Sequence, residues 1–328
     1  MNYNILIIYP NSFPSGGAAT NRVFHIAKAI QEGAANVNII ITRGTERKNN
    51  IVNSKVSGVF KEVPFFYATT TVIWPNSSIG RLFNLALGLL KTINLLYFNR
   101  KKIDIIISYA DYSLINNFSF FMFCKLAKKK FVCCVDEHPW SVINGRNTFL
   151  NRIHIKYFYK LFDGFIVMTN ILIDYYKTKC RSDAKFIHIP MTVEFERFEF
   201  GKKKTTEEYI AYCGGDKTGT KDGIDILIKA FNVIKDEHTA LKLYIIGPVH
   251  KTIKLLVSEL KLDRRVVFFG FINGDKVPDL LINAKILCLA RPNNKQAEGG
   301  FPTKLGEYLA SGVPIVVTNI GEIRKPSV

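Results

Sequence analysis

Short runs of Ile, Val, Leu and Phe recur along the chain, and mixed apolar and polar stretches of helical length separate them. Runs that are apolar at nearly every position are typical of parallel strands covered on both faces of a sheet. Their alternation with helices favours an α/β fold with parallel sheets. We expect strands at Ile5–Tyr9, Val37–Thr42, Ile103–Ser108, Phe131–Asp136, Phe165–Met168, Phe186–Ile189, Tyr209–Cys213, Leu241–Ile246, Val266–Phe269, Ile286–Leu289 and Ile315–Thr318.

A polar stretch rich in Lys, Thr and Glu divides the predicted strands into two sets. With 328 residues, 48% of them hydrophobic, the chain is long and apolar enough for two globular domains. We therefore predict a domain over 1–196, a linker over 197–208 and a second domain over 209–328. Only Asn319–Val328 follow the last predicted strand, so the second domain is expected to lack a closing segment.

The run from Glu298 to Val317 carries the clearest chemical signal in the chain. A turn of Gly, Phe, Pro and Thr opens a short helix, which Gly312–Pro314 end before a β-branched strand. Free N–H groups at a helix start suit a phosphate, and Pro302 suits the first helical position. Glu307, one turn into the helix, has the two carboxylate oxygens needed to accept hydrogen bonds from a ribose diol. The combination favours a nucleoside-diphosphate sugar as ligand.

This run resembles the signature of the family-four retaining glycosyltransferases, which have the GT-B fold. Their pattern is a Glu, a Gly-Phe-Pro or similar turn, a second Glu eight positions after the first, and then Ala-x-x-x-Gly-x-Pro-Val-Val. Glu307 fits the second Glu, whereas Glu298 lies nine positions before it because Gly299 and Gly300 occupy a turn where one glycine is usual. An ordinary strand–turn–helix would explain Gly312 and Pro314, but it would not readily explain the whole run.

Two glycine-rich loops after predicted strands extend the resemblance. Gly16 and Gly17, followed by Ala18 and then Arg22, resemble the family's Gly-Gly-Ala-x-x-x-Arg loop over the donor phosphates and the acceptor. After the first strand of the second domain, Lys221 matches a family Lys on the diphosphate. The matching Arg position falls on Asp216, with Lys217 beside it as a substitute. A solvated loop lysine is the structural alternative for Lys221, and a Gly pair by itself is a weak signal.

His138 ends a predicted strand of the first domain, where residues of an α/β site belong. Family members often carry a His near the donor sugar at a comparable place, although a lone His is more often structural. Asp136 and Glu137 beside it have the chemistry to activate an acceptor hydroxyl. The chain has no Asp-x-Asp pair, which favours a reaction without a metal ion.

The resemblance implies a GT-B fold of two doubly wound Rossmann-like domains facing a cleft, the second incomplete. Domain 1–196 is expected on the acceptor side and 209–328 to bind the nucleotide sugar. The implied enzyme moves a sugar from a UDP- or GDP-linked donor to a hydroxyl acceptor. The implied reaction retains the anomeric configuration of the sugar and needs no metal ion and no further cofactor. The predicted catalytic residues are Glu298 and His138, and the predicted donor-binding residues are Gly16, Gly17, Lys217, Lys221, Gly299, Gly300, Phe301, Pro302, Thr303, Lys304 and Glu307.

The net charge of +18 requires a partner or a surface of opposite sign. No acidic residue occurs between Glu62 and Asp104, where the apolar stretch Ile79–Arg100 carries Arg81 and Lys91. As a helix with a basic flank, this stretch is predicted to lie on an anionic membrane rather than to cross it, and a buried helix is the alternative. We find no motif of a nucleic-acid reader and predict no nucleic-acid partner.

The N-terminus and the cysteines favour a cytoplasmic protein. The first apolar run has no basic start and ends at Pro10, so it is interpreted as a strand and not as a signal peptide. The six cysteines form no CxxC pair, as expected for free thiols in a reducing compartment. We expect a cytoplasmic enzyme of surface polysaccharide or glycolipid synthesis, with a peripheral position on the inner face of the cytoplasmic membrane and a glycan or lipid-linked acceptor. A non-catalytic, truncated GT-B protein and a sugar-nucleotide epimerase of the same fold stay open as alternatives.

Overall fold

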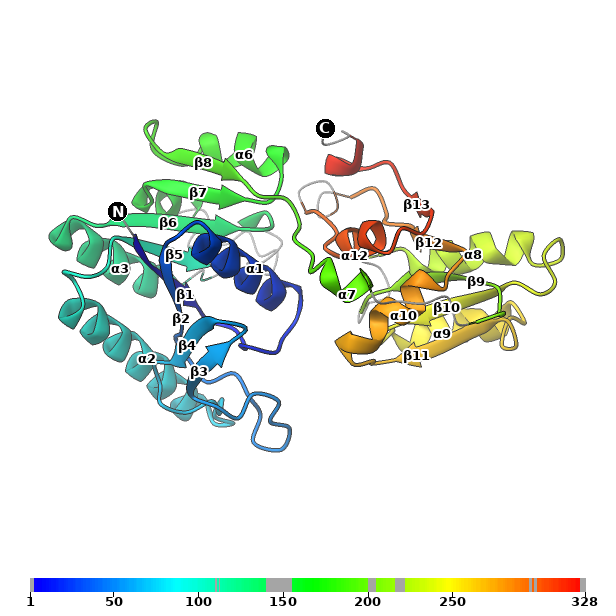
Figure 1. The fold of residues 1–328 in the computed structure, drawn as a ribbon, viewed down its shortest axis with the longest axis horizontal. Coiled ribbons are helices and arrows are strands. Elements are labelled where there is room, and N and C mark those ends of the chain that lie inside the picture. The colour runs from blue at the N-terminus through cyan, green and yellow to red at the C-terminus, as the bar shows by residue number, and fades with distance from the viewer. Residues whose placement is uncertain are drawn as a thin grey trace. The chain divides into compact units, whose positions relative to one another are not determined.

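The computed structural model describes residues 3–109, 111, 113–139, 155–199, 205–215, 222–294, 297 and 300–324. The chain divides into two compact units, Met1–Thr192 and Val193–Val328, which are described separately below. In each unit a sheet lies between helices that connect successive strands (Figure 1). The stretch 197–208 predicted as a linker belongs to the second unit, and a short helix, α7 (Glu196–Glu199), occupies its beginning.

Unit 1 contains an eight-stranded sheet of order β3-β4-β2-β1-β5-β6-β7-β8, in which only the β3–β4 pair is antiparallel. The six strands predicted for this half are all present, each within two residues of the predicted bounds. The strands are β1 (Asn4–Tyr9), β2 (Asn36–Ile41), β3 (Ser57–Phe60), β4 (Val63–Tyr67), β5 (Ile105–Tyr109), β6 (Lys130–Val135), β7 (Gly164–Val167) and β8 (Lys185–His188).

The hairpin of β3 and β4 is absent from the sequence-based prediction. Its two turn residues, Lys61 and Glu62, both have positive φ angles, of 44° and 71°. Two-residue hairpin turns need such angles and usually take Gly or Asn there, so this turn carries no glycine or asparagine signal in the sequence. Pro64 in β4 further weakens the strand pattern.

Helix α1 (Ala18–Glu32) covers one face of the unit 1 sheet. Its residues Val23, Phe24, Ile26 and Ala27 pack with β1, β2 and β4 in the main core of the unit. Helices α2 (Ser78–Phe98) and α3 (Leu114–Ala127) pack against each other, and α6 (Asn170–Lys177) packs beside β7 and β8. A 3-10 turn, η1 (Phe158–Leu161), contacts α3.

Helix α2 buries a stripe of mostly small and polar residues and exposes many of its large apolar residues. Asn84, Gly88, Thr92 and Leu96, each four positions after the last, form the buried stripe. Asn84 accepts a hydrogen bond from the backbone N–H of Gly44 at 3.0 Å, and a Cβ at Gly88 would lie 1.7 Å from the carbonyl oxygen of Thr42. The outer residues of the helix are largely exposed: Ile79, Leu82, Phe83, Leu90 and Phe98.

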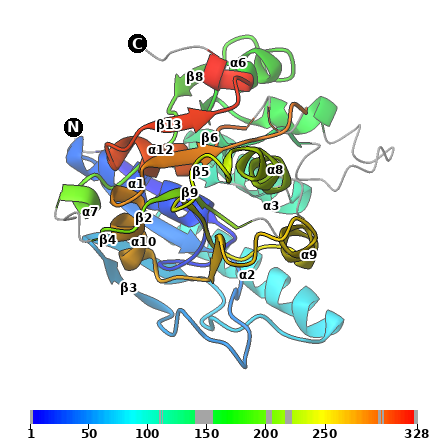
Figure 2. The same ribbon diagram turned by 90° about the vertical axis from the view of Figure 1, so that its right-hand side faces the viewer.

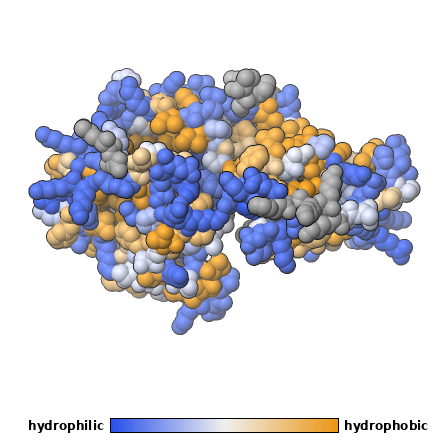
Figure 3. All heavy atoms as spheres, viewed as in Figure 1, coloured by the Kyte–Doolittle hydropathy of each residue, from blue (hydrophilic) through white to orange (hydrophobic). Residues whose placement is uncertain are grey.

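The outward apolar face of α2 continues onto α3, where Ile115, Phe118 and Leu126 are exposed. Figure 3 shows apolar atoms gathered among hydrophilic ones on the side of unit 1 where Figure 1 places these helices. Within the described residues, α2 is long and apolar enough to cross a membrane by length and composition alone. Its contacts with Gly44 and Thr42 show that it is packed on unit 1 along one side.

Unit 2 contains a five-stranded parallel sheet of order β11-β10-β9-β12-β13. All five predicted strands of this half are confirmed, as is the α/β class. The strands are β9 (Tyr209–Cys213), β10 (Lys242–Ile246), β11 (Val266–Gly270), β12 (Ile286–Leu289) and β13 (Ile315–Val317). Figure 2 shows α8 and α9 on one face of this sheet and α7 and α10 on the other. The helices are α8 (Ile224–Ile234), α9 (Lys251–Glu259), α10 (Val277–Ile282) and α12 (Lys304–Ala310), with 3-10 turns η2 (Gly274–Lys276) and η3 (Gly321–Arg324).

Candidate functional site

Glu307 is held in place by a cation from a distant part of unit 2. It lies on α12, and its Oε1 accepts a hydrogen bond from Nη1 of Arg197 at 2.9 Å. Arg197 is on α7, and its Nη2 also donates to the carbonyl oxygen of Gly274 at 2.5 Å. The Glu307 side chain stays 26% exposed, so the pair fixes the carboxylate without burying it. This pair could not be predicted from the sequence, because 110 residues separate its members.

Lys304, which opens α12, points into unit 2 and forms a buried cluster with Tyr212 and Asp222. Its Nζ donates to the hydroxyl of Tyr212 at 2.9 Å and forms an ion pair with Asp222. Tyr212 in turn donates to Asp222 at 2.6 Å. Burial alone would raise the pKa of Asp222, but the Lys304 ammonium and the hydrogen bonds from Lys304 and Tyr212 outweigh it and lower that pKa. The cluster therefore ties the start of α12 to the end of β9.

The turn before α12 differs in detail from the prediction. Pro302 was expected at the first helical position, but the helix begins at Lys304 with Thr303 as its N-cap residue. The N–H of Leu305 bonds to the carbonyl of Pro302 at 2.9 Å, so a tighter turn precedes the α-helix. Phe301 is half-buried, and the carbonyl of Gly300 accepts from Nη1 of Arg291 at 3.1 Å. Gly312 ends the helix as predicted, with a φ of +68°.

Four of the predicted site residues lie outside the described residues. They are Glu298, Gly299, Lys217 and Lys221. Among the residues that the structure describes, no three or more His, Cys, Asp or Glu side chains are grouped as a metal ion would need.

Gly16 and Gly17 lie in unit 1, in the loop between β1 and α1. Both line a cavity of about 520 Å³, together with Ser12, Thr45 and Trp74. A Cβ at Gly16 would lie 2.1 Å from Oγ1 of Thr20, which explains a glycine there by packing alone. Gly17 is the N-cap residue of α1, and nothing lies within 4 Å of a Cβ placed on it.

His138 follows β6 and is buried in unit 1. Its ring meets that of Tyr175 on α6 edge to face, with 4.9 Å between the ring centroids. Burial lowers the pKa of His138 to about 4, so its imidazole is neutral at physiological pH. It is not among the residues that line the two unit 1 cavities described here.

This low pKa predicts an acid-dependent loss of stability in unit 1. Between about pH 6.5 and about pH 4, unfolded His138 binds a proton that folded His138 does not, so stability is full above this window and falls as the pH decreases through it. Thermal unfolding of His138→Gln should show a smaller decline in Tm over this range than the wild type. The exposed His238→Gln serves as control. Parallel curves for the wild type and His138→Gln would contradict the prediction.

Asp136 and Arg22 form an ion pair in unit 1, in which the arginine is buried and the carboxylate is partly exposed. Nε of Arg22 donates to Oδ1 of Asp136 at 2.8 Å, and the hydroxyl of Tyr109 donates to Oδ2. The other guanidinium nitrogens of Arg22 donate to the carbonyl oxygens of Ile189 and Pro190. Arg22 is only 2% exposed, so it connects α1, β6 and the end of unit 1 from within.

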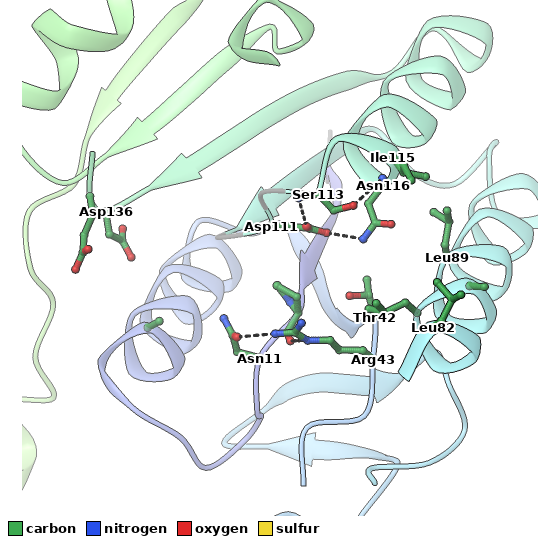
Figure 4. A pocket seen from close by; sticks show the side chains of 15 residues that line it. Asn11, Thr42, Arg43, Leu82, Leu89, Asp111, Ser113, Ile115, Asn116 and Asp136 are labelled. Carbon is green, nitrogen blue, oxygen red and sulfur yellow. Dashed lines mark hydrogen bonds between the residues drawn. The ribbon is translucent and has the colours of Figure 1, made fainter. Parts of the chain in front are cut away.

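A second cavity of unit 1, of about 710 Å³, has residues that sequence reasoning missed. Asn11, Arg43 and Asp111 line it, each two positions after the end of β1, β2 or β5. These three strands are neighbours in the sheet, so their ends meet at one edge. Figure 4 shows Arg43 beside Asn11, and Asp111 within reach of Ser113 and Asn116. The sequence signal for this site was a polar residue two positions after the end of each of three parallel strands.

Comparison with known proteins finds a similarity that covers unit 2. Residues 194–325 match the family model described as "Glycosyl transferases group 1". "Uncharacterized glycosyltransferase MJ1607" of Methanocaldococcus jannaschii is 33% identical over 117 residues, which are 35% of this chain and 28% of that protein. The match therefore spans less than a third of the length of that curated relative.

Solved structures resemble the whole chain. Sucrose-phosphate synthase from Thermosynechococcus elongatus has a TM-score of 0.68 at 14% identity, covering 98% of this chain and 82% of that one. Alr3699/HepE from Anabaena, solved with UDP and glucose, has a TM-score of 0.66 at 15% identity, with the same coverage of 98% and 82%. WaaG, a glycosyltransferase involved in lipopolysaccharide biosynthesis, has a TM-score of 0.63 at 14% identity, and the likeness covers 97% of this chain and 82% of WaaG. At these identities the likeness shows the fold, and it confirms the predicted GT-B class.

Proposed function

We propose that this protein is a glycosyltransferase that moves a sugar from a nucleoside-diphosphate sugar to a hydroxyl acceptor in surface polysaccharide or glycolipid synthesis. The observation that carries the proposal is the match of residues 194–325 to the group 1 glycosyltransferases, within a chain of the GT-B fold. Alr3699/HepE, one of the structural neighbours, was solved with UDP-glucose, which supports a nucleotide-sugar donor.

Glu307 is the proposed anchor of the donor nucleotide. Arg197 already bonds to its Oε1, and Oε2 would accept hydroxyl hydrogen bonds from the ribose. Lys304 has a positioning role in this proposal, because its ammonium is bound to Asp222 and Tyr212 and holds the helix that carries Glu307.

The proposed chemistry is metal-independent and retaining, with the charge of the leaving diphosphate neutralised by lysines. Lys217 and Lys221 are assigned this role from their place after β9, and cations fixed near a developing negative charge lower the barrier to its formation. The turn Gly299–Thr303 is assigned to the diphosphate, and Glu298 to the sugar. The roles of Gly16, Gly17 and His138 stay predictions made from the resemblance.

Nucleotide binding tests the proposal directly. Calorimetric titration with UDP and with GDP, in EDTA, should show binding of one of them by the wild type. Glu307→Ala should weaken it about 10- to 100-fold, because a hydrogen bond to a charged group contributes about 1.5–3 kcal/mol. Glu259→Ala, a matched change on the exposed side of α9, should leave the affinity unchanged. If neither nucleotide binds the wild type at millimolar concentration, the donor site is absent.

We further propose that the protein works in the cytoplasm on the inner face of the membrane, bound through unit 1. Helix α2 buries Asn84 and Thr92 while it exposes leucines and phenylalanines. An exposed apolar face of this kind is typical of a surface that binds a membrane or another protein. The segment between Glu62 and Asp104 has cations and no acidic residue, so the surface suits anionic lipid headgroups.

A further inference from the structure

The larger cavity of unit 1 has two chemically different walls. One wall carries Asn11, Arg43, Asp111 and Asn116, at the ends of β1, β2 and β5 and the start of α3. The other is formed by Leu82, Leu85, Ala86 and Leu89 of α2 and Ile115 of α3. Figure 4 shows Leu82 and Leu89 projecting from α2 on the side opposite Asn11, and Ile115 beside Asn116 on α3. A volume of about 710 Å³ is within the usual size of small-ligand sites.

Arg43 is the cation among the residues that line the cavity, which also include the carboxylates of Asp111, Asp136 and Glu137. Nε of Arg43 donates to the carbonyl oxygen of Pro10 at 2.6 Å, and Nη2 lies 3.5 Å from Oδ1 of Asn11. The guanidinium also lies over the ring of Trp74, 5.3 Å from its centroid. These contacts hold the side chain in one orientation at the cavity, as is needed for bidentate recognition of a phosphate.

Asp111 and Asn116 give the same wall a place for a hydroxyl group. Asp111 accepts hydrogen bonds from the N–H of Ser113 and from Nδ2 of Asn116, both at 2.9 Å. The Asp111 carboxyl is thus fixed by its neighbours, and its acceptor capacity of four lone pairs exceeds these two bonds. A sugar hydroxyl is a donor that such a group binds well.

The apolar wall continues to the outer surface of the protein. Leu82 is 70% exposed and Ile115 is 71% exposed, although both line the cavity. They belong to the same outward face of α2 and α3 that includes Phe83, Leu90 and Phe118. An apolar chain lying along Leu82, Leu85 and Ile115 would therefore run from the cavity directly onto the surface proposed to meet the membrane.

We propose that this cavity binds the acceptor, and that the acceptor is an anionic lipid with a phosphate and an apolar chain. Its phosphate pairs with Arg43, a hydroxyl of its head group bonds to Asp111, and its chain covers the leucines of α2. A free glycan would leave the leucine wall in water, and the fixed Arg43 is the cation that the phosphate would meet. The inference rests on the proposed transferase function and specifies the substrate class of that function.

Short single-chain amphiphiles test the cavity without knowledge of the natural acceptor. Below its micellar concentration, decyl phosphate should bind the full chain at least 10-fold more tightly than either inorganic phosphate or decyl glucoside, measured by calorimetry. Arg43→Gln should weaken decyl phosphate at least 10-fold, whereas the exposed neighbour Arg47→Gln should not. Equal affinities for the three probes, or an unchanged Arg43→Gln, would overturn the inference.

A second variant keeps the test decisive if Arg43→Gln fails to fold. Leu85→Gln changes an exposed helix position and should weaken decyl phosphate about 3- to 10-fold while leaving inorganic phosphate unaffected. Leu255→Gln, on α9 of unit 2, is its control.

UDP and GDP titrations on the same samples separate the two proposals. Nucleotide binding with no preference for decyl phosphate overturns the lipid acceptor alone, and absence of nucleotide binding overturns the transferase.

Discussion

Replacing Arg22 by Met is expected to lower the free energy of unfolding of unit 1 by about 3–5 kcal/mol. The guanidinium is 2% exposed and bonds to Asp136, Ile189 and Pro190, so its removal leaves a largely buried carboxylate and two carbonyl oxygens without their cation. For a unit of this size, the loss corresponds to a fall in Tm of about 10 °C. Scanning calorimetry and urea unfolding would measure it.

The same variant distinguishes a structural arginine from one that contacts the donor. Nucleotide affinity, measured well below the Tm of the variant, should stay within about twofold of the wild type. The reason is that the guanidinium makes its hydrogen bonds to residues of unit 1. Arg22→Met combined with Asp136→Leu should recover part of the lost stability, since the unpaired charge is removed as well. A large loss of nucleotide affinity with little loss of stability would show instead that Arg22 reaches the donor.

Replacing Ile79, Phe83 and Leu90 together by Gln should weaken binding to anionic vesicles by at least about 100-fold. The three side chains are 84%, 68% and 68% exposed, and Gln keeps the helix propensity while removing their transfer energy of about 1.5–3 kcal/mol each. Co-sedimentation with phosphatidylglycerol vesicles measures the change. Binding of the wild type should also fall with added salt and be weak for phosphatidylcholine vesicles, because the basic residues around α2 contribute through their charge.

A triple change on unit 2 provides the matched control for the membrane surface. Val233, Leu255 and Phe271 are 76%, 59% and 87% exposed there, and their replacement by Gln should leave vesicle binding unchanged. If both triple variants bind vesicles as the wild type does, the apolar face of α2 has another use. If the α2 variant is less soluble or melts earlier, the side chains of Ile79, Phe83 and Leu90 contribute to the fold of unit 1.

The strands of both units were predictable because their signal is local. A run such as Tyr209–Cys213 has to be covered on both faces wherever it lies, so its composition indicates a central parallel strand, and β9 lies between β10 and β12. The exception is the β3–β4 hairpin, whose turn uses Lys61 and Glu62 at positive φ in place of the residues that usually mark such turns.

The candidate site was predictable only in part. Glu307 and the turn before it could be found because a contiguous motif carries them. Arg197 could not, since its partner is 110 residues away and only the packing of α7 against α10 and η2 brings the two together. Lys304 was predicted to bind the donor, but whether a lysine at a helix start points to a ligand or inward depends on Asp222 and Tyr212, which other elements supply.

The sequence by itself determined the α/β class, the alternating strands, the motif around Glu307 and the apolar, basic character of α2. These depend on residue type and spacing along a few turns or strands of chain. The tertiary structure decided that Arg22 is buried, that Asn11, Arg43 and Asp111 meet at one sheet edge, and that α2 presents its leucines outward. Each of these depends on which distant backbone lies against the residue, because burial, charge pairing and the direction of a helix face are properties of contacts and not of composition.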